Sequence, residues 1–171
     1  MVRLEPYRAR HAAAVQRLAE DARIAATTLL PHPYPADGAA RFADEAARAR
    51  DRDEAYAFAV VADGGRGGGE VVGSCGLKHV DRDEGQAEVG YWIGVPYWGR
   101  GYASAAVREV VRVAFDALGF DRLVAEVLEA NPASARVLDK AGFETVGRFT
   151  NPNDRHAGAP TVLYQIDRPA R

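Results

Sequence analysis

One ten-residue segment, Val95–Ser104, constrains the fold of this chain more than any other. An apolar run precedes it and a long amphipathic segment, Tyr102–Leu118, follows it. A strand is therefore expected to end at Val95, and a helix to begin at about Gly101. The first N–H groups of a helix are unpaired and carry partial positive charge. Because Gly99 and Gly101 have no side chain, a phosphate or pyrophosphate group can approach this backbone closely.

Two better-known phosphate-binding loops do not fit these glycines. A dinucleotide fingerprint requires an acidic residue at the end of the next strand, whereas Asp121 stands before the strand expected over 123–128. A Walker-type loop requires a Gly-Lys-Ser/Thr sequence, which does not follow here. An ordinary strand-to-helix turn stays open as the interpretation of the two glycines alone.

A second segment gives the glycine turn a context. It contains Asn131-Pro132-Ala133-Ser134, followed by Val137-Leu138-Asp139-Lys140-Ala141-Gly142-Phe143. In this order the two segments resemble the GNAT superfamily of acetyl-CoA-dependent N-acetyltransferases, and most closely its branch of ribosomal-protein N-terminal (RimJ/RimL-like) acetyltransferases. The pyrophosphate loop of that family, Gln/Arg-x-x-Gly-x-Gly/Ala, falls on 98–103, with Trp98 in place of the leading Gln or Arg.

Hydrophobic periodicity places further elements along the chain. Strands are expected over 2–7, 55–61, 71–80, 88–95, 123–128, 143–149 and 161–166, and helices over 11–24, 38–50, 102–118 and 132–141. Asp37 is expected to cap the second helix, Gly119 to end the third, and the glycine run 63–69 to form a hairpin loop. With the resemblance, the expected fold class is α+β: a GNAT-type mixed, mostly antiparallel sheet with helices on both faces and a splayed central strand pair.

Length and composition predict one globular domain, 1–171. Hydrophobic residues make up 47% and charged residues 27%. A net charge of −2 gives no attraction to nucleic acid or to an anionic membrane, and no apolar run suits a signal or a membrane span. The single cysteine, Cys75, favours a reducing compartment, so a cytoplasmic location is expected, with Cys75 as a buried, inert thiol. No His, Cys or carboxylate spacing predicts a metal site.

The resemblance implies acetyl-CoA as co-substrate and assigns it a binding site. The backbone of Ile93, Gly94 and Val95 is expected to contact the pantetheine arm and the thioester, with an N–H near Val95 as donor to the carbonyl oxygen. Asn131 is expected to contact the same arm or a bound water, and it also suits a helix N-cap. Trp98 is expected at the mouth of the site or as a plain surface aromatic. The pyrophosphate is expected on Gly99, Arg100, Gly101, Tyr102, Ala103 and Ser104.

Ser134 and Glu88 are the expected catalytic residues. Many GNAT enzymes carry a tyrosine seven residues after the asparagine as proton donor to the departing thiolate, but Leu138 occupies that position here. Ser134 stands where the resemblance places a serine for the same task, and an exposed hydroxyl is its plain alternative. Glu88 is the expected base, directly or through water, against the alternative of a solvated strand-edge carboxylate. His32 and His79 are rival bases.

The acceptor is expected to be a small-molecule amine or a peptide N-terminus, attacking directly in a ternary complex. His32 and Tyr34 lie in a stretch that resembles the family's Leu-Pro-x-Pro-Tyr, so they are expected to line the acceptor cleft; a rigid connection without ligand contact is the alternative. Relatives often show Asp-Val-x-x-Tyr near the C-terminus, but this chain has Pro160-Thr161-Val162-Leu163-Tyr164, and the loss of that aspartate argues against a protein N-terminus. The alternative function is a non-catalytic acyl-CoA-binding sensor, and a homodimer is left open.

Overall fold

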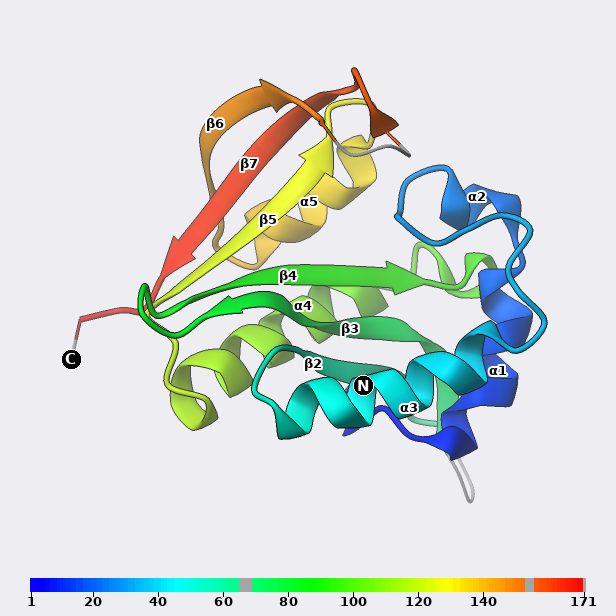
Figure 1. Cartoon of the computed structure of the whole chain (residues 1–171). Coiled ribbons are helices and arrows are strands. Elements are labelled where there is room, and N and C mark those ends of the chain that lie inside the picture. The colour runs from blue at the N-terminus through cyan, green and yellow to red at the C-terminus, as the bar shows by residue number, and fades with distance from the viewer. Residues whose placement is uncertain (65–68, 153–155, 171) are drawn as a thin grey trace.

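The computed structural model describes residues 1–64, 69–152 and 156–170. Within these ranges, seven strands form one sheet in the order β1-β2-β3-β4-β5-β7-β6 (Figure 1). Neighbouring strands are antiparallel except β4 and β5, which run parallel because a helix crosses between them. This arrangement confirms the expected α+β class. The strands are β1 (Val2–Pro6), β2 (Tyr56–Ala62), β3 (Glu70–Asp81), β4 (Gln86–Ile93), β5 (Arg122–Leu128), β6 (Glu144–Thr150) and β7 (Pro160–Asp167).

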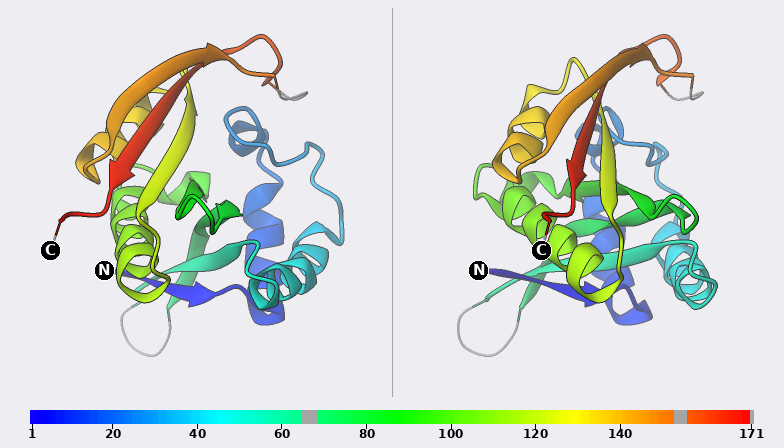
Figure 2. Two further views of the ribbon diagram at one scale, coloured as in Figure 1. Left: turned by 60° about the vertical axis from the view of Figure 1, so that its left-hand side comes forward. Right: turned by 90° about the vertical axis from the view of Figure 1, so that its left-hand side faces the viewer.

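Helices cover both faces of the sheet, as expected (Figure 2). They are α1 (Ala9–Ala19), α2 (Ala22–Ala25), α3 (Gly38–Asp51), α4 (Tyr102–Arg112) and α5 (Pro132–Lys140). Alternation along β2 separates the two layers, because successive side chains of a strand point to opposite faces. Ala59 and Val61 pack with α1 and α3, whereas Phe58 and Val60 belong to the core that includes α4 and α5.

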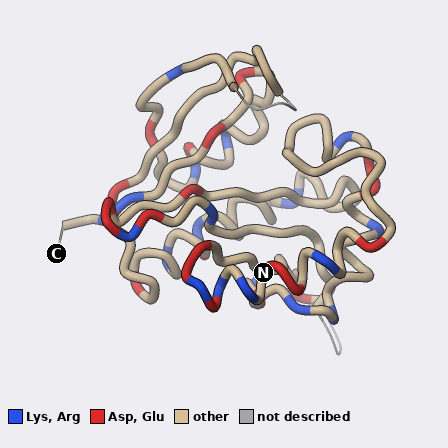
Figure 3. The backbone as a smooth tube through the Cα atoms, in the orientation of Figure 1, with Lys and Arg blue, Asp and Glu red and all other residues tan. Residues whose placement is uncertain are grey.

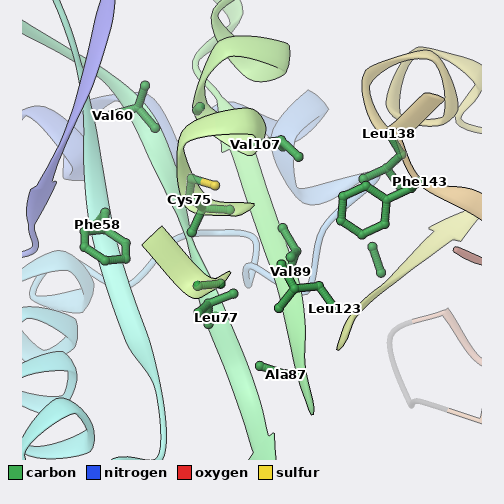
Figure 4. Close-up of a cluster of buried hydrophobic side chains, with 14 of the residues drawn as sticks. Phe58, Val60, Cys75, Leu77, Ala87, Val89, Val107, Leu123, Leu138 and Phe143 are labelled. Carbon is green, nitrogen blue, oxygen red and sulfur yellow. The ribbon is translucent and has the colours of Figure 1, made fainter. Parts of the chain in front are cut away.

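The larger core lies between the sheet and the helices α4 and α5 (Figure 4). The apolar stripe expected on the helix after the glycine turn is buried, and Val107, Val110 and Ala114 are fully covered. They share this core with Leu123 of β5 and Leu138 of α5. Full burial of one such side chain stabilises the fold by about 1.5–3 kcal/mol. This packing fixes α4 against the sheet, and it thereby fixes the position of the first turn of α4.

The strands β4 and β5 separate after a short parallel stretch. Their pairing joins Gln86–Glu88 to Arg122–Val124. Beyond it, β4 stays paired with β3 as far as Ile93, and β5 stays paired with β7 as far as Leu128. The two strands therefore part in a V, and α4 and α5 both begin near its wide end (Figure 1). The end of the pairing confirms the expected splayed strand pair, and the region between the parted strands is called the β4–β5 cleft below.

Two elements end earlier than the sequence predicted. β4 ends at Ile93 rather than at residue 95, because Pro96 has no N–H for the sheet and the chain turns through the 3₁₀ segment Val95–Tyr97. The helix expected over 11–24 is two helices. The side chain of Asp21 accepts a hydrogen bond from the Arg23 N–H at 3.0 Å, which caps α2 and separates it from α1.

Further corrections concern the helix ends. The helix expected to reach residue 118 ends at Arg112, and a π-helical turn, Val113–Ala117, continues to Gly119, which ends it with φ of +77° as expected. Asp37 does not cap α3 with its side chain; its carboxylate pairs with Arg41 at 3.2 Å instead. Most of the glycine run expected to form a hairpin loop, residues 65–68, lies outside the described residues.

Candidate cofactor and acceptor site

The first turn of α4 is uncapped. Gly101, at the N-cap, has φ of +77°, and among the described residues no side chain accepts a hydrogen bond from this turn. A Cβ added at Gly101 or at Gly99, which has φ of +75°, would meet nothing within 4 Å. Both glycines are therefore needed for the backbone conformation, and both leave open space in front of it. The free N–H groups and their partial positive charge can receive an anion at the wide end of the β4–β5 cleft.

The other residues of this turn contribute backbone rather than side chains. Ser104 is buried, and Tyr102 and Ala103 pack against the main core. Their side chains thus face protein. Arg100 is exposed, with its guanidinium 5.7 Å from the centre of the Tyr97 ring, so it remains available to an anion.

The Trp98 side chain is hydrogen bonded to the end of β4. Its indole N–H donates a hydrogen bond to the Ile93 carbonyl oxygen at 2.6 Å, while half of the side chain is exposed. Gly94 is also engaged, because its N–H donates to the Val72 carbonyl oxygen at 2.8 Å and its own carbonyl accepts from Tyr97 at 2.9 Å. In the part of the chain that the structure describes, the Val95 N–H has no acceptor. Val95 therefore offers a free donor beside the cleft.

The start of α5 brings Ser134 against a residue of β4. Asn131 caps this helix by accepting from the Ser134 N–H at 3.2 Å, as expected. The Ser134 hydroxyl oxygen lies 2.6 Å from the phenol oxygen of Tyr91, and that phenol also reaches the Ser134 carbonyl oxygen at 3.1 Å. Burial raises the pKa of the Tyr91 phenol, which keeps it protonated. Leu138, at the family's tyrosine position, is fully buried in the core and cannot replace it.

Glu88 is a buried carboxylate that contacts two more exposed side chains. It is 8% exposed, and its carboxylate is 2.9 Å from the Lys78 ammonium and 2.7 Å from Nδ1 of His79. The β3–β4 register places Lys78 directly opposite Glu88. His79 has φ of +49° at the irregular step of this register. The alternative of a solvated strand-edge glutamate is therefore wrong, and the rival base His79 is a hydrogen-bond partner of Glu88.

Tyr91 and Glu126 are site residues that the sequence reasoning missed. Burial and the nearby charge of Glu88 raise the pKa of the Glu126 carboxyl, so carboxylates stand on both sides of the cleft. The available signal was the sequence of β5, in which the charged Glu126 interrupts an apolar run; its side chain is exposed in the structure. For Tyr91 the partner lies 43 residues away, and no local pattern indicates that contact.

The two expected acceptor residues, His32 and Tyr34, lie in the segment between α2 and α3. His32 is exposed, and Tyr34 is half-buried with its ring over Gly38, where an added Cβ would meet a ring atom at 2.9 Å. Burial raises the pKa of the Tyr34 phenol. Among the described residues, no hydrogen bond or ion pair joins either of them to Glu88 or Ser134.

Other features of the described chain do not add to this site. A cavity of about 210 Å³ lies between α5 and the strands β5, β6 and β7, but it includes neither Glu88 nor Ser134. Lys, Arg, Asp and Glu are interspersed along the backbone (Figure 3). Across residues 1–64, 69–152 and 156–170, no three His, Cys, Asp or Glu side chains are grouped to hold a metal ion. In the same ranges, no helix has both the length and the apolar character needed to cross a membrane.

A sheet that opens between two parallel strands, with an uncapped helix start at the opening, defines an acetyltransferase-type α+β fold. The family model described as an acetyltransferase (GNAT) domain matches residues 2–144, and the chain belongs to this family. An uncharacterized N-acetyltransferase of Bacillus licheniformis, p20, is 37% identical over 78 residues, which are 46% of this chain and 44% of that protein. The chain spans about half the length of the curated relatives it matches.

Solved structures agree with the fold. RimJ of Mycobacterium smegmatis, in complex with CoA-disulfide, has a TM-score of 0.85 at 24% identity, with 97% of this chain and 81% of that chain covered. Spermidine N-acetyltransferase from Vibrio cholerae, in complex with CoA and spermine, has a TM-score of 0.81 at 15% identity, with 97% and 95% covered. RimJ and the spermidine N-acetyltransferase are therefore neighbours of this chain in fold, and the family model confirms the GNAT resemblance.

Proposed function

We propose that this chain is an N-acetyltransferase that moves an acetyl group from acetyl-CoA to a primary amine, by direct attack in a ternary complex. The observation that carries the proposal is the uncapped start of α4 at the wide end of the β4–β5 cleft. Membership of the GNAT family and the CoA held by two solved neighbours support it.

The co-substrate fits the free backbone groups around the cleft. The pyrophosphate binds the N–H groups of 99–104, and Arg100 adds a positive charge beside them. The pantetheine arm enters between the parted strands, near Asn131. The free N–H of Val95 donates to the thioester carbonyl oxygen, where negative charge develops during attack. Trp98 lies at the mouth and contributes by fixing the end of β4.

The acceptor amine enters on the side of Glu88. Glu88 takes a proton from the amine directly or through water, with Lys78 and His79 holding its carboxylate in place. The charge of Glu126 across the cleft attracts a cationic acceptor. His32 and Tyr34 line the outer part of the path. A small-molecule amine and a peptide N-terminus both suit this chemistry.

The reaction requires no covalent intermediate on the protein. The amine nitrogen attacks the carbonyl carbon and forms the C–N bond; the C–S bond then breaks, and its electron pair stays with sulfur. Ser134 faces this leaving group as donor. The nitrogen loses one proton and the sulfur gains one, so the exchange balances. Cys75 is fully buried, and burial raises the pKa of its thiol to about 12, which makes it unsuited as a nucleophile.

The test is thiol release by the complete chain. We expect free CoA thiol when acetyl-CoA is incubated with at least one member of a panel of polyamines, amino acids, amino sugars and short peptides, together with an acetylated product by mass spectrometry. Acetyl-CoA without amine is the control. Calorimetric binding of CoA without turnover across the panel would instead indicate the sensor function, and absence of binding would contradict both.

A further inference from the structure

Tyr91 links the two sides of the β4–β5 cleft. It belongs to β4, whereas its partner Ser134 belongs to the helix that follows β5. The phenol oxygen lies 2.6 Å from the Ser134 hydroxyl oxygen and 3.1 Å from the Ser134 carbonyl oxygen. Among the described residues, Tyr91 is the side chain that hydrogen bonds to this hydroxyl. The contact therefore determines where the Ser134 hydroxyl points.

The donor in this contact decides what Ser134 can do. A phenol has one hydrogen to donate, and burial raises the pKa of Tyr91 and so keeps that hydrogen in place. If the phenol donates to the Ser134 hydroxyl oxygen, the hydrogen of Ser134 is free for a ligand. If the phenol donates to the carbonyl, the hydrogen of Ser134 is used on the phenol. Either oxygen can donate across the 2.6 Å contact, and the first arrangement is the one in which the phenol holds the Ser134 hydroxyl and leaves its hydrogen for a ligand.

The geometry points to Tyr91 as a positioning residue that orients the Ser134 hydroxyl as a hydrogen-bond donor to the departing sulfur of the acyl thioester. This inference rests on the proposed function. When the C–S bond breaks, the electron pair on sulfur accepts the hydrogen bond of Ser134, which the bond from Tyr91 polarises. The amine loses its proton to Glu88, which passes it on to solvent, and solvent supplies the proton that the thiolate finally holds. Tyr91 and Ser134 are therefore neutral before and after each turnover.

The inference explains how the chain acts without the family's tyrosine. That position is Leu138, which is buried in the core and has no proton to give. Tyr91 supplies a phenol from the sheet rather than from α5, and it acts through Ser134 instead of on the sulfur itself. Both residues belong to elements fixed by the core, so their 2.6 Å contact is preorganised.

The test compares Tyr91→Phe with Tyr7→Phe. Tyr7 is a matched control because it is also buried, and its hydroxyl has no partner among the described residues. We expect Tyr91→Phe to lower kcat about tenfold, the effect of one ordinary hydrogen bond, with KM for acetyl-CoA changed less than about twofold. Tyr7→Phe leaves kcat unchanged. Equal kcat for Tyr91→Phe and wild type, with thermal unfolding showing both folded, would overturn the inference.

A double variant separates the inference from the proposed function. In the Ser134→Ala background, Tyr91→Phe should have no further effect on kcat, because it acts only through Ser134. An undiminished tenfold loss in that background would show a role independent of Ser134 and contradict the inference alone. An unchanged kcat for Ser134→Ala itself would remove both the role of Ser134 and the inference.

Fluorinated tyrosines at position 91 give a readout that a purely structural role would not move. They keep the hydroxyl and the ring shape but change the strength of the phenol as a donor. We expect each to restore most of the activity lost in Tyr91→Phe, with kcat following the acidity of the phenol. A series with no trend, or without recovery, would contradict a donor role for Tyr91.

Discussion

The Lys78 ammonium lies 2.9 Å from the Glu88 carboxylate, in a pair whose glutamate is nearly covered by protein. The β3–β4 register sets this contact, since the two residues are directly opposite in the ladder. A buried carboxylate is costly to leave without its partner, even though the Lys78 side chain is itself 37% exposed. The pair thus fixes Glu88 beside the cleft and also makes the position sensitive to change.

We expect Glu88→Gln to lower kcat by about a hundredfold with little effect on acetyl-CoA affinity, as for loss of a general base. Lys78→Met should lower the free energy of unfolding by about 1–3 kcal/mol, because it leaves Glu88 without its ammonium partner. Steady-state kinetics and urea unfolding check the two effects. Lys140→Met, at the exposed end of α5, is the control for loss of a lysine. A Glu88→Gln variant with full kcat would exclude the carboxylate as base.

Gly101→Ala should weaken CoA binding about tenfold, because a methyl group would enter the open space in front of the free N–H groups. It should also cost about 1 kcal/mol of stability from the left-handed backbone. Gly119→Ala is a matched control, since Gly119 has the same φ of +77° and equally open surroundings. Calorimetry on both variants separates strain from binding. Equal CoA affinities would place the pyrophosphate elsewhere.

Cys75→Ala should retain wild-type kcat, because the thiol is buried and its pKa is raised to about 12 by burial. Rapid-quench mass spectrometry of the wild type with acetyl-CoA should find no acetylated protein. Iodoacetamide should modify Cys75 only after unfolding. A burst of acetylated chain before product appears would contradict direct attack.

The stability of the chain should depend on pH through Glu5. Hydrogen bonds from Arg10, His11 and Arg3 lower the pKa of this carboxyl from 4.5 to about 2. A lowered pKa in the folded state means that the stabilisation is complete above about pH 4.5 and is lost as the pH falls to about 2.

Glu5→Gln should therefore lower the free energy of unfolding by about 1 kcal/mol at neutral pH, with some of the effect screened by solvent. The difference from wild type should shrink as the pH is lowered below about 4.5. Urea unfolding at several pH values measures both. Glu54→Gln, in the exposed pair with Arg52, serves as control and should change stability less. A difference for Glu5→Gln that does not depend on pH would contradict this account.

The elements with a strong local signal could be predicted from the sequence. The stripe through Val107 and Val110 identified the buried face of α4, and the glycine turn located the start of that helix. The ends of the elements were harder to predict. The apolar run of β4 continues to Val95, but the strand ends at Ile93 because Pro96 has no N–H for the sheet. Local patterns specify which face a strand buries, but not where its neighbour stops.

The candidate site could be predicted from the sequence only where its residues are close together in the chain. The cap formed by Asn131 and the hydroxyl of Ser134 follow from a short motif. The contacts of Glu88 with Lys78 and of Tyr91 with Ser134 depend on strand register and on packing between distant segments. Strand alternation places Glu88 and Tyr91 on opposite faces of β4, but it gives no information on their partners.

The short parallel stretch between β4 and β5 has a mechanical consequence. The sheet consists of two parts, β1 to β4 and β5 to β7. Within the described residues, they are hydrogen bonded to each other only through β4 and β5, over three residues of each strand. The separation of the two strands is thus set by this short pairing together with the Tyr91–Ser134 contact, and we expect substitutions at Ala87 or Leu123 to alter how a ligand fits without touching it. Because β4 and β5 are already unpaired with each other beyond Glu88 and Val124, a ligand that enters between them does not have to break strand pairing.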